Sequence, residues 1–492
     1  MTILDLFDGA VREHGTRLAV ERLSYDEFDR AHRRVARRLR DLGLKPGDRL
    51  AIYAENSLGF ILAYFGALRA GLSVVPANVL YRASDVRHVL ENAGARTVVA
   101  SSESRRHIEA LADGYRIVPI DDIEGWAADE SAPYGDLPDA PAQDDIAMIV
   151  YTSGTTGRSK GAMLSHYNLA ANAAQLMAAW RWTHLDTLLI ALPLFHIHGL
   201  IAALSTSLAS GGRIVVHQRF DAGAIVQAMT DEGATMFFGV PTMYVRLLEA
   251  AGDRPVPKLR LFVSGSAALA PAVFEGFARR FGSEILERLG ATECGFVTSN
   301  RLAGPRVPGS VGIALPATRA KIVGQDDLLP VPTGDIGELC VSGPTVFPGY
   351  WQNAQASADA FLVDPDGTRW YRMGDLARYE AAQGVYEIVG RTKELIISGG
   401  FNIYPREVET EIDRFAGVRA SAVVGMPDPA RGELPVAFVE CDAPIEVEAL
   451  FAYLRERIAS FKVPKAVHII EALPRNALGK VEKQKLKDQL TR

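Results

Sequence analysis

The sequence has few cysteines, no surplus of charge of one sign, and no internal repeat or low-complexity tract. Its three cysteines, Cys294, Cys340 and Cys441, are widely separated, which excludes a disulfide framework and a Cys-x-x-Cys metal site. The 53 basic and 59 acidic side chains leave a net charge of −6, so the chain has no general electrostatic attraction to nucleic acid or anionic lipid. We therefore expect no nucleic-acid partner.

One uncharged hydrophobic run is long enough to span a bilayer. The segment Leu188–Gly212 contains no Asp, Glu, Lys or Arg, but it includes Pro193, two histidines and several Ser and Thr residues. We predict a strand at Leu188–Leu192, a polar turn and a buried helix at Leu200–Leu208 instead of a membrane span. The first residues carry acids where a secretory signal carries bases, so we expect a reduced, cytoplasmic protein.

Length and composition are those of a globular protein with several domains. The chain has 492 residues, of which 48% are hydrophobic and 23% are charged, which suits roughly two to four domains. In its N-terminal part short apolar strands alternate with helices, which is typical of parallel sheets with helices on their faces. The predicted strands there are Leu50–Ala54, Val74–Val75, Ile146–Tyr151, Thr187–Ala191, Arg213–His217 and Leu261–Ser264.

The pattern changes in the last third of the chain. Between Arg319 and Tyr386 the strands are shorter and separated by Gly and Pro turns, which indicates an antiparallel or barrel-like piece. After Arg391 about 100 residues remain, enough for a small α+β domain. We predict an α/β fold, with a large N-terminal domain of two helix-flanked sheets plus a small β-barrel-like subdomain, and a smaller α+β C-terminal domain. The elements predicted in the C-terminal domain are helices Pro405–Asp413 and Glu446–Ile458, and strands Ala420–Val424, Val436–Glu440 and Ala466–Ile470.

The strongest local signal is the segment Tyr151–Gly161, which directly follows an apolar strand. Its Gly, Ser and Thr residues let backbone N–H groups approach an anion closely, while hydroxyls and a lysine add donors and positive charge. The spacing differs from that of a Walker loop, and a flexible surface loop is the alternative interpretation. The residues predicted to bind nucleotide phosphates are Thr152, Ser153, Gly154, Thr155, Thr156, Gly157 and Lys160.

This segment resembles the phosphate-binding loop of the adenylate-forming superfamily, which includes acyl-CoA synthetases, luciferases and the adenylation domains of peptide synthetases. Further motifs of that superfamily follow in order along nearly the whole chain: Pro193–Gly199, Ser264–Ala268, Gly290–Glu293, Gly374–Asp375, Gly390–Arg391, Ser398–Gly400 and Pro474–Lys480. The resemblance implies a two-step reaction. A carboxylate and ATP give an acyl-adenylate and pyrophosphate, and a thiol, usually that of coenzyme A, then displaces AMP.

The same resemblance implies a division into domains and a set of co-substrates. It implies an AMP-binding N-terminal domain of residues 1–390, a hinge at residues 391–393 and a mobile C-terminal lid of residues 394–492. It also implies ATP, Mg²⁺ and coenzyme A, with a small carboxylic acid as the substrate. No carrier or condensation segment follows Arg492, so we expect no carrier-protein partner.

The matched residues take roles that suit their chemistry. By resemblance, Lys480 bridges the carboxylate and the ATP α-phosphate, two anions whose approach requires positive charge; without the motif, a solvated tail lysine would be the better interpretation. Thr292 would donate to the α-phosphate, Glu293 would ligate Mg²⁺, Asp375 would accept the ribose hydroxyls, and Arg391 would contact ribose or phosphate. The other matched nucleotide positions are Ser266, Ala267, Ala268 and Gly290.

The resemblance also implies a hinge residue and a coenzyme A channel. Lys393 matches the hinge about which the lid rotates. That rotation would replace Lys480 with the loop of Ser398, Gly399 and Gly400, whose glycines let a thin pantetheine arm pass close to the backbone. A tight hairpin turn is the alternative explanation of the two glycines.

Two histidines are candidates for the acyl site. His196 and His198 follow Pro193 and would point to the same side of an extended segment, although a buried histidine is more often a core residue. By resemblance the segment borders the acyl pocket, and His196 responds to the lid. Ser264 and Ala291 match further positions of the pocket wall.

Within the superfamily the sequence is most similar to malonyl-CoA synthetases. That resemblance implies that Arg246, helped by His198, holds a second carboxylate, and a bidentate guanidinium suits such a group. The alternative is that Arg246, on a helix predicted at Thr242–Glu249, turns outward or pairs with Glu249.

Several positions depart from the malonate pattern and keep the substrate open. The departures are Leu289 in place of tyrosine, Ala291 in place of methionine, the stretch Cys294–Val297 and Met373. We expect a coenzyme A ligase for a small dicarboxylic acid such as malonate or methylmalonate. The alternatives are a ligase for a medium-chain, branched or aromatic monocarboxylic acid, and an adenylation enzyme that loads a carrier protein.

Overall fold

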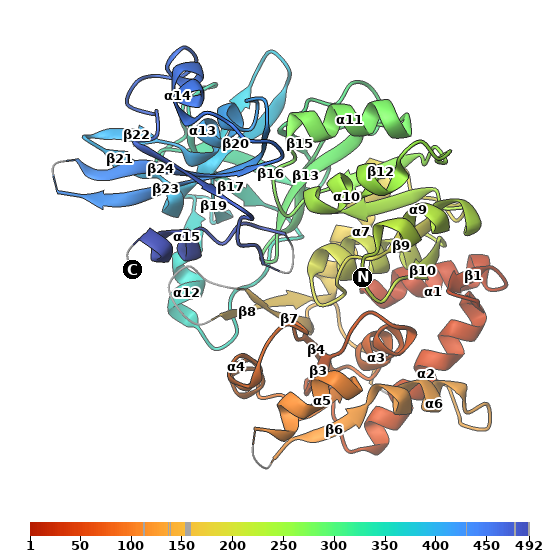
Figure 1. Ribbon diagram of the computed structural model, residues 1–492. Helices are drawn as coiled ribbons and strands as arrows, with labels where there is room; N and C mark the ends of the chain where they lie inside the picture. Colours follow the sequence, from red (N-terminus) through yellow and green to blue (C-terminus); the bar gives the residue numbers. More distant parts are fainter. Residues whose placement is uncertain are drawn as a thin grey trace.

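The computed structural model describes residues 1–111, 114–135, 137, 139–152, 159–429, 431–476 and 479–490, and these form three sheets flanked by helices (Figure 1). The first sheet has the order β6-β5-β3-β4-β7-β8 and is parallel except for the β7–β8 pair. Its strands are β3 (Arg49–Tyr53), β4 (Ser73–Pro76), β5 (Thr97–Ala100), β6 (Arg116–Pro119), β7 (Ile146–Thr152) and β8 (Lys160–Ser165). The strands predicted near residues 50, 74 and 146 are thus confirmed.

Five helices that belong to this sheet join its strands or pack beside it. They are α2 (Tyr25–Asp41), α3 (Leu58–Arg69), α4 (Ala83–Ala93), α5 (Ser102–Glu109) and α6 (Ile120–Ala128). Ser57 caps α3 by accepting a hydrogen bond from the Phe60 N–H at 3.1 Å. The preceding residue, Asn56, donates to the Leu192 carbonyl and accepts from the Leu194 N–H, both at 2.9 Å. It therefore ties the first sheet to the second.

The second sheet is larger and begins with parallel strands. These are β1 (Leu18–Val20), β9 (Thr187–Ile190), β10 (Arg213–Val216), β11 (Met236–Gly239), β12 (Leu261–Ser264) and β13 (Ile285–Ala291), with β2 (Leu23–Ser24) antiparallel at the edge. The helices that accompany this sheet are α1 (Ile3–His14), α7 (His166–Trp180), α9 (Ala222–Asp231), α10 (Pro241–Ala251) and α11 (Pro271–Phe281). One hydrophobic core fills the space between the two sheets, and a second lies under α9, α10 and α11.

The antiparallel piece continues this second sheet. Its strands are β14 (Gly295–Ser299), β15 (Ser310–Ala314), β16 (Arg319–Val323), β17 (Gly337–Ser342), β18 (Phe361–Val363), β19 (Arg369–Glu380) and β20 (Val385–Arg391), with α12 (Ala354–Asp359) between β17 and β18. The β13–β14 hairpin joins the parallel and the antiparallel strands through hydrogen bonds. Together these two parts make one sheet of fourteen described strands. The piece that we expected to be barrel-like is therefore continuous with its neighbour.

The uncharged run Leu188–Gly212 lies inside the N-terminal domain, in the part that contains the second sheet. It contains β9, a π-helix η1 (His198–Ser205) and α8 (Thr206–Ala209). The helical part therefore begins two residues earlier than the predicted Leu200, and its residues are almost entirely buried. Within the described residues, no helix combines the length and the apolar character that crossing a membrane requires.

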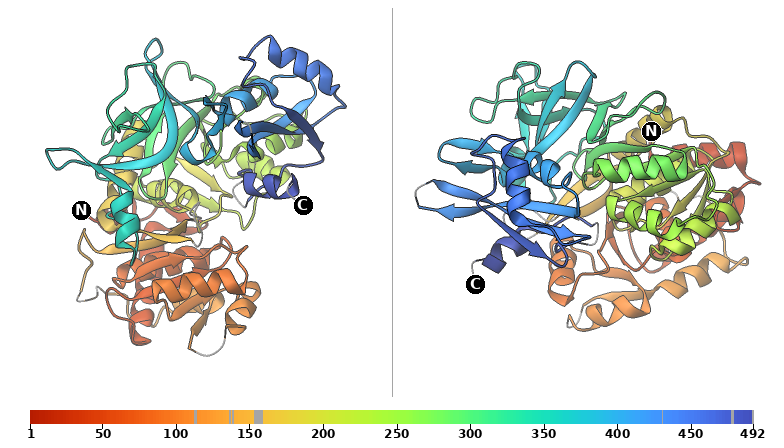
Figure 2. Two further views of the ribbon diagram at one scale, coloured as in Figure 1. Left: turned by 90° about the vertical axis from the view of Figure 1, so that its left-hand side faces the viewer. Right: turned by 45° about the horizontal axis from the view of Figure 1, so that its top comes forward.

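The C-terminal unit is a separate α+β body with its own core. Its five-stranded sheet has β21 (Ile396–Ser398), β22 (Phe401–Ile403), β23 (Val418–Asp428), β24 (Gly432–Cys441) and β25 (Ala466–Ile470), and its helices are α13 (Pro405–Ile412), α14 (Val447–Arg455) and α15 (Lys483–Leu490). Figure 2 shows this unit seated against one side of the N-terminal domain. Strands β23 and β24 are longer than predicted, because their pairing continues to Asp428 opposite Gly432.

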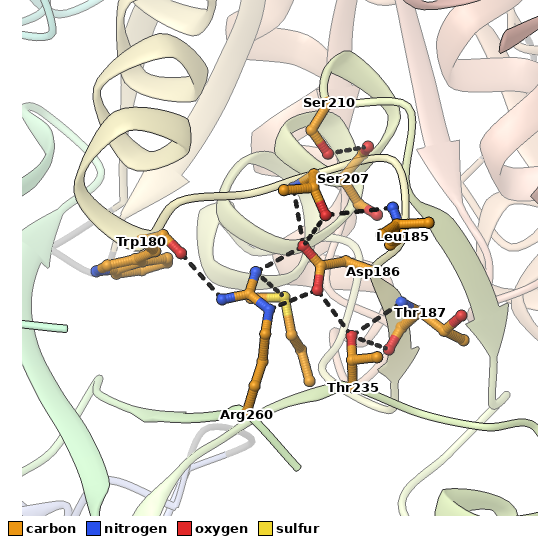
Figure 3. A network of polar contacts seen from close by, with 10 residues as sticks. Trp180, Leu185, Asp186, Thr187, Ser207, Ser210, Thr235 and Arg260 are labelled. Atoms are coloured by element: carbon orange, nitrogen blue, oxygen red, sulfur yellow. Dashed lines mark hydrogen bonds and ion pairs between the residues drawn. The ribbon is translucent and has the colours of Figure 1, made fainter. Parts of the chain in front are cut away.

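A polar network ties together the N-terminal ends of three parallel strands (Figure 3). Asp186 precedes β9, Thr235 precedes β11 and Arg260 precedes β12. The Arg260 guanidinium donates to both oxygens of Asp186, at 2.5 and 2.6 Å, and to the Trp180 carbonyl at 3.0 Å. The Thr235 hydroxyl donates to the same carboxylate at 2.9 Å. This network holds the strand ends opposite the edge where the predicted site residues lie.

Loss of Arg260 should lower the stability of the N-terminal domain. Asp186 is 3% exposed, so Arg260→Ala leaves a buried carboxylate without its bidentate partner and should cost about 2 kcal/mol in the free energy of unfolding. Urea unfolding measures this. Arg279→Ala is the control, because its pair with Glu275 spans 3.8 Å and is mostly exposed, which is worth less than about 0.5 kcal/mol. Equal midpoints for the two variants would contradict the prediction.

Candidate active site

The predicted site motifs follow the carboxyl ends of four parallel strands. Strand β9 leads to Pro193–Gly199, β11 to α10, β12 to Ser264–Ala268, and β13 to the turn at Thr292. Because β9, β11, β12 and β13 are neighbours in one sheet, these segments meet at the same edge, which is where ligands bind in open α/β sheets. The fold therefore brings together residues that lie about 100 positions apart.

Both ends of the predicted phosphate loop are fixed beside each other. Thr152 ends β7, Lys160 begins β8, and the two residues are paired across the β7–β8 ladder. The Lys160 ammonium lies 5.3 Å from the ring centre of Tyr350. Five predicted phosphate-binding residues lie outside the described part of the chain: Ser153, Gly154, Thr155, Thr156 and Gly157.

Glu293 is a buried carboxylate held by two hydroxyls. It follows Thr292 in the turn between β13 and β14, and it is 8% exposed. The Tyr350 hydroxyl donates to its Oε1 at 2.9 Å, and the Thr152 hydroxyl donates to the same oxygen at 3.3 Å. The described residues make no hydrogen bond to Oε2. A free carboxylate oxygen beside a phosphate loop fits Mg²⁺, which takes one or two carboxylates and completes its shell with phosphates and water.

Asp375 and Arg391 form an ion pair at the junction of the two domains. They are paired across β19 and β20, and Arg391 Nε lies 3.0 Å from Asp375 Oδ1. The Asp375 side chain is buried, whereas the Arg391 side chain is 44% exposed. Burial raises the pKa of Asp375, although Arg391 and Lys480 oppose that shift. The preceding residue of β19, Gly374, donates its N–H to Glu338 at 3.3 Å. Asp375 is therefore a rigidly placed acceptor that fits two adjacent ribose hydroxyls.

Lys480 lies in the same junction and is not a solvated tail lysine. Burial lowers the pKa of Lys480, and Arg391 lowers it further, while Glu394 and Asp375 raise it. Its backbone N–H donates to Asn476 Oδ1 at 3.1 Å. The preceding Gly479 has φ +72°, and a Cβ there would lie 2.8 Å from the Thr242 hydroxyl of α10. The lysine loop is thus docked closely on the N-terminal domain.

Lys483 fixes the position of this loop, a role that was not predicted from the sequence. Its ammonium pairs with Glu394 of the turn η2 (Thr392–Glu394) at 2.9 Å and with Glu409 of α13 at 2.7 Å. Burial opposes the charge, but the two carboxylates raise the pKa of Lys483. Lys483 therefore joins α15 to the turn η2 and to α13 of the C-terminal unit.

The predicted hinge and coenzyme A residues lie in short connections. Lys393 is in the turn η2, between β20 and β21. Gly399 and Gly400, with φ +59° and +83°, form the tight turn between β21 and β22, next to the buried Ser398. This geometry agrees with the alternative of a hairpin turn, and Figure 1 shows β21 and β22 on the outer side of the lid. Their contact with coenzyme A stays a prediction.

The loop after β12 has a strained backbone. Ser264 is fully buried and its hydroxyl has no hydrogen-bond partner among the described residues. Ser266 has φ +70°, a left-handed conformation that a non-glycine residue adopts at a cost of roughly 1 kcal/mol or more. Ala267 is half-buried and Ala268 is exposed. Such strain is concentrated at functional sites, which agrees with the predicted nucleotide role of this loop.

The two histidines do not lie on an extended segment, so that expectation was wrong. The chain turns after Pro193, and the helix η1 begins at His198. Gly199 allows the turn, because a Cβ there would lie 2.6 Å from the Pro193 carbonyl oxygen. His196 is half-buried against Phe195, and burial lowers its pKa to about 4. His198 is fully buried, and burial and the nearby Arg288 lower its pKa.

Arg246 does not point into a buried pocket, which corrects the orientation that the malonate resemblance implied. Its side chain is exposed on α10, and its guanidinium carbon lies 5.1 Å from the ring centre of Phe220. The outward alternative is therefore the one that the structure shows. Arg246 is one helical turn after Thr242, so it lies on the face of α10 that meets the lysine loop.

Arg288 is the buried cation of this region, and it was not among the site residues predicted from the sequence. It lies on β13, two residues before Gly290, and it is 5% exposed. Its Nε and Nη2 atoms have no hydrogen-bond partner among the described residues, and no described carboxylate forms an ion pair with it. Its carbon Cζ lies 4.2 Å from the ring centre of Phe296. Burial lowers the pKa of Arg288 to about 9. The available signal was the pair of adjacent charged residues, Glu287 and Arg288, in an otherwise apolar strand.

The acid next to Arg288 does not neutralise it. Neighbouring residues of a strand point to opposite faces, and Glu287 accepts hydrogen bonds from the Gly309 and Leu269 N–H groups at 2.9 and 3.4 Å. Burial raises the pKa of Glu287 to about 7. Arg288 instead lies near His198. It also lies near Ser264, because the next residue, Gly265, packs against the Arg288 guanidinium. Ala291, three residues further along β13, is half-buried.

Comparisons with known proteins identify the family. Residues 7–351 match the AMP-binding enzyme family, and residues 407–480 match the AMP-binding enzyme C-terminal domain. The chain is 36% identical to a feruloyl-CoA synthase of Amycolatopsis over 96% of this chain and 94% of that protein. It is 36% identical to a sulfoacetate–CoA ligase of Cupriavidus necator over 90% of this chain and 88% of that protein. The crystal structure of ATP-bound MatB from Rhodopseudomonas palustris superposes with a TM-score of 0.91 at 37% identity, with 99% of each chain covered.

These matches confirm the superfamily, the fold class and the reaction class that the motifs predicted. Enzymes of this class use ATP, Mg²⁺ and coenzyme A, and the free carboxylate oxygen of Glu293 suits such a metal. The chain therefore belongs to the AMP-binding, adenylate-forming enzyme family and is an AMP-forming acid–CoA ligase.

Proposed function

We propose that this ligase acts on a small acid that carries a second negatively charged group, such as malonate or methylmalonate. The observation that supports this is the buried guanidinium of Arg288, which has no carboxylate partner among the described residues. An isolated buried charge is destabilising by several kcal/mol, so it is kept where a ligand supplies the opposite charge. The planar fork of arginine suits the bidentate recognition of a carboxylate or sulfonate.

The groups around Arg288 favour a short substrate. Among the described residues, neither ring nitrogen of His198 nor the hydroxyl of Ser264 has a hydrogen-bond partner, so both side chains can bond the second anionic group. The rings of Phe238 and Phe296 lie 6.2 and 6.0 Å from the His198 ring and close the region on two sides. A long acyl chain would meet these rings and the guanidinium together.

One relative agrees with a substrate that carries a second anionic group, and another agrees with an aromatic acid. A sulfoacetate ligase acts on an acid with a second anion, whereas a feruloyl-CoA synthase acts on an aromatic acid. Ala291 and the aromatic relative favour a second candidate, a bulkier monocarboxylic acid, because a small side chain there widens the pocket wall. Arg288 favours the dicarboxylate, since a monocarboxylate would leave the guanidinium unpaired.

We propose the following first step for the site. The substrate carboxylate attacks the α-phosphorus of ATP, the bond to the β-phosphate oxygen breaks, and pyrophosphate leaves. Lys480 neutralises the two approaching anions, Thr292 donates to the α-phosphate, and Asp375 and Arg391 hold the ribose. Glu293 would hold Mg²⁺, which when bound would supply positive charge for the leaving pyrophosphate.

The second step requires a different position of the lid. Rotation about Lys393 would withdraw Lys480 and bring the Ser398–Gly400 turn to the adenylate. The thiolate of coenzyme A then attacks the acyl carbon, the bond to the AMP oxygen breaks, and AMP leaves. Two large apolar side chains beside this turn, Ile397 and Phe401, are 53% and 55% exposed, as expected of a surface that is covered in another lid position.

A substrate screen tests the proposal. Pyrophosphate exchange and thioester formation are measured with malonate, methylmalonate, sulfoacetate, propanoate, hexanoate, benzoate and ferulate. We expect kcat/KM for malonate or methylmalonate to exceed that for propanoate. A strong preference for hexanoate, benzoate or ferulate would refute the dicarboxylate proposal. Acyl-adenylate formation without thioester release would indicate a carrier protein as the acceptor.

Arg246 should contribute little to the recognition of the acid. Its guanidinium is exposed, and an exposed ion pair is worth at most about 1 kcal/mol, so Arg246→Ala should change the malonate KM by no more than about fivefold. Steady-state kinetics with malonate and propanoate measure this effect. A change well above tenfold, confined to malonate, would show that Arg246 turns inward when substrate binds.

A further inference from the structure

We propose that Tyr350 is a positioning residue that holds Glu293 and Lys160 in the arrangement needed to bind metal and nucleotide phosphates. The inference rests on the proposed roles of Glu293 and Lys160. Tyr350 is remote from both in sequence, but its hydroxyl contacts one of them and its ring contacts the other. A single side chain thus links the carboxylate of the β13–β14 turn to the cation at the start of β8.

The backbone around Tyr350 is fixed directly to the strand that carries Lys160. Residue 350 forms a β-bridge with Ala162, and the neighbouring Trp351 N–H donates to the Gly161 carbonyl at 2.7 Å. The Tyr350 N–H donates to the Ser357 hydroxyl at 2.8 Å. These bonds leave the backbone at Tyr350 little freedom relative to β8. Its ring therefore keeps a constant position relative to Lys160.

The hydroxyl of Tyr350 selects which oxygen of Glu293 remains available. Tyr350 and Thr152 both donate to Oε1, and Tyr350 makes the shorter bond, 2.9 Å against 3.3 Å. With Oε1 occupied, the carboxylate presents Oε2 in a defined direction. Groups that orient a metal-binding carboxylate in this way change metal affinity by roughly 10- to 100-fold when they are removed.

The ring of Tyr350 acts on Lys160. The ammonium lies 5.3 Å from the ring centre, within the range of a cation–π interaction. The ring is itself held edge-on by Phe347, whose centroid lies 4.9 Å away, and Phe347 also packs against Tyr371. A flexible lysine side chain at the edge of the phosphate loop is thereby restrained. Removing the hydroxyl and removing the ring should therefore have separable effects.

The experiment measures ligand binding without any acid substrate. Mn²⁺ is titrated onto the enzyme in the presence of α,β-methylene ATP, whose bridge between the α- and β-phosphorus cannot be cleaved to transfer AMP, and bound metal is followed by electron paramagnetic resonance. We expect Tyr350→Phe, which removes only the hydroxyl, to raise the Mn²⁺ dissociation constant about tenfold. Thr152→Val removes the longer bond and should have a smaller effect, while the double variant should exceed either one.

A second measurement separates the role of the ring. In the presence of EDTA, Tyr350→Phe should bind the ATP analogue as the wild type does, whereas Tyr350→Leu should bind it about threefold more weakly, because the cation–π contact is lost. Tyr379→Phe is the matched control, since its ring pairs with Tyr386 at the far end of β19. Its constants should equal those of the wild type.

The outcomes distinguish this inference from the proposed function. If Tyr350→Phe and Thr152→Val both bind Mn²⁺ as tightly as the wild type, Glu293 needs no orienting hydroxyl and the inference is wrong. If the wild-type protein binds neither the metal nor the ATP analogue, the proposed adenylation itself fails. Thermal unfolding without ligands checks each variant. If Tyr350→Phe is destabilised, the Mn²⁺ affinity of Thr152→Val decides, because the Thr152 hydroxyl donates to the same oxygen of Glu293.

Discussion

Lys480→Ala should reduce pyrophosphate exchange into ATP by about 10²- to 10³-fold, the usual effect of removing one group that stabilises developing negative charge. The site brings two anions together, and the structure places the Lys480 ammonium in the junction formed by Asp375, Arg391 and Glu394. Substitution of Lys480 by alanine removes the cation that bridges the substrate carboxylate and the α-phosphate of ATP. The loss should appear in kcat, with little change in the affinity for ATP, because the charge acts mainly while the carboxylate attacks.

The proposed lid rotation provides an internal control for Lys480. If Lys480 serves only the first step, Lys480→Ala should form thioester from added acyl-adenylate and coenzyme A at nearly the wild-type rate. Lys485→Ala is the matched variant, because Lys485 is exposed on α15, five residues after Lys480, and pairs only with Glu482 among the contacts described, so it should retain full exchange activity. Equal loss in both half-reactions would show that the substitution disturbs the lid and not the adenylation chemistry.

Lys480 also predicts a pH dependence. Burial and Arg391 lower its pKa below the usual 10.5, so the ammonium loses its proton at a lower pH than an exposed lysine does. The adenylation rate should therefore fall as the pH rises through that lowered value. Lys480→Arg keeps its charge at high pH and should remove this limb of the profile.

The sequence predicted those parts of the fold that depend on short-range patterns. Strands such as β12 and β25 were predicted with the bounds that the structure has, since a short run of mostly apolar residues between turns defines a strand locally. The continuity of the antiparallel strands with the second sheet was not predicted, because it depends on hydrogen bonds between β13 and β14 that no periodicity encodes.

Candidate site residues were named where motifs carry them and missed where tertiary partners create their character. Glu293, Asp375 and Lys480 were named from motifs; the structure places Asp375 near Lys480, and the roles of the three residues stay predictions. Arg288 and Lys483 were missed because their character depends on burial and on partners from other elements, which a single sequence does not show. Such residues resemble ordinary surface charges until the fold surrounds them.

Arg288→Leu should reduce kcat/KM for malonate by about 100-fold or more, while propanoate is used as well as before or better. Truncating one partner of a buried charge pair costs roughly 2–5 kcal/mol, and here the substrate carboxylate would be left buried without its cation. Leucine fills much of the space and presents an apolar surface that accepts the methyl group of propanoate. Arg288→Lys should recover only part of the malonate activity, because an ammonium lacks the bidentate fork.

The same substitution should not destabilise the free enzyme. In the absence of substrate Arg288 is a buried cation whose Nε and Nη2 lack hydrogen-bond partners in the part of the chain that the structure describes, so replacing it with an apolar residue should leave the free energy of unfolding unchanged or raise it by about 1 kcal/mol. Thermal unfolding of Arg288→Leu with and without malonate measures this. The wild type should gain stability from malonate and the variant should not. A destabilised variant that still uses malonate would show that Arg288 is structural.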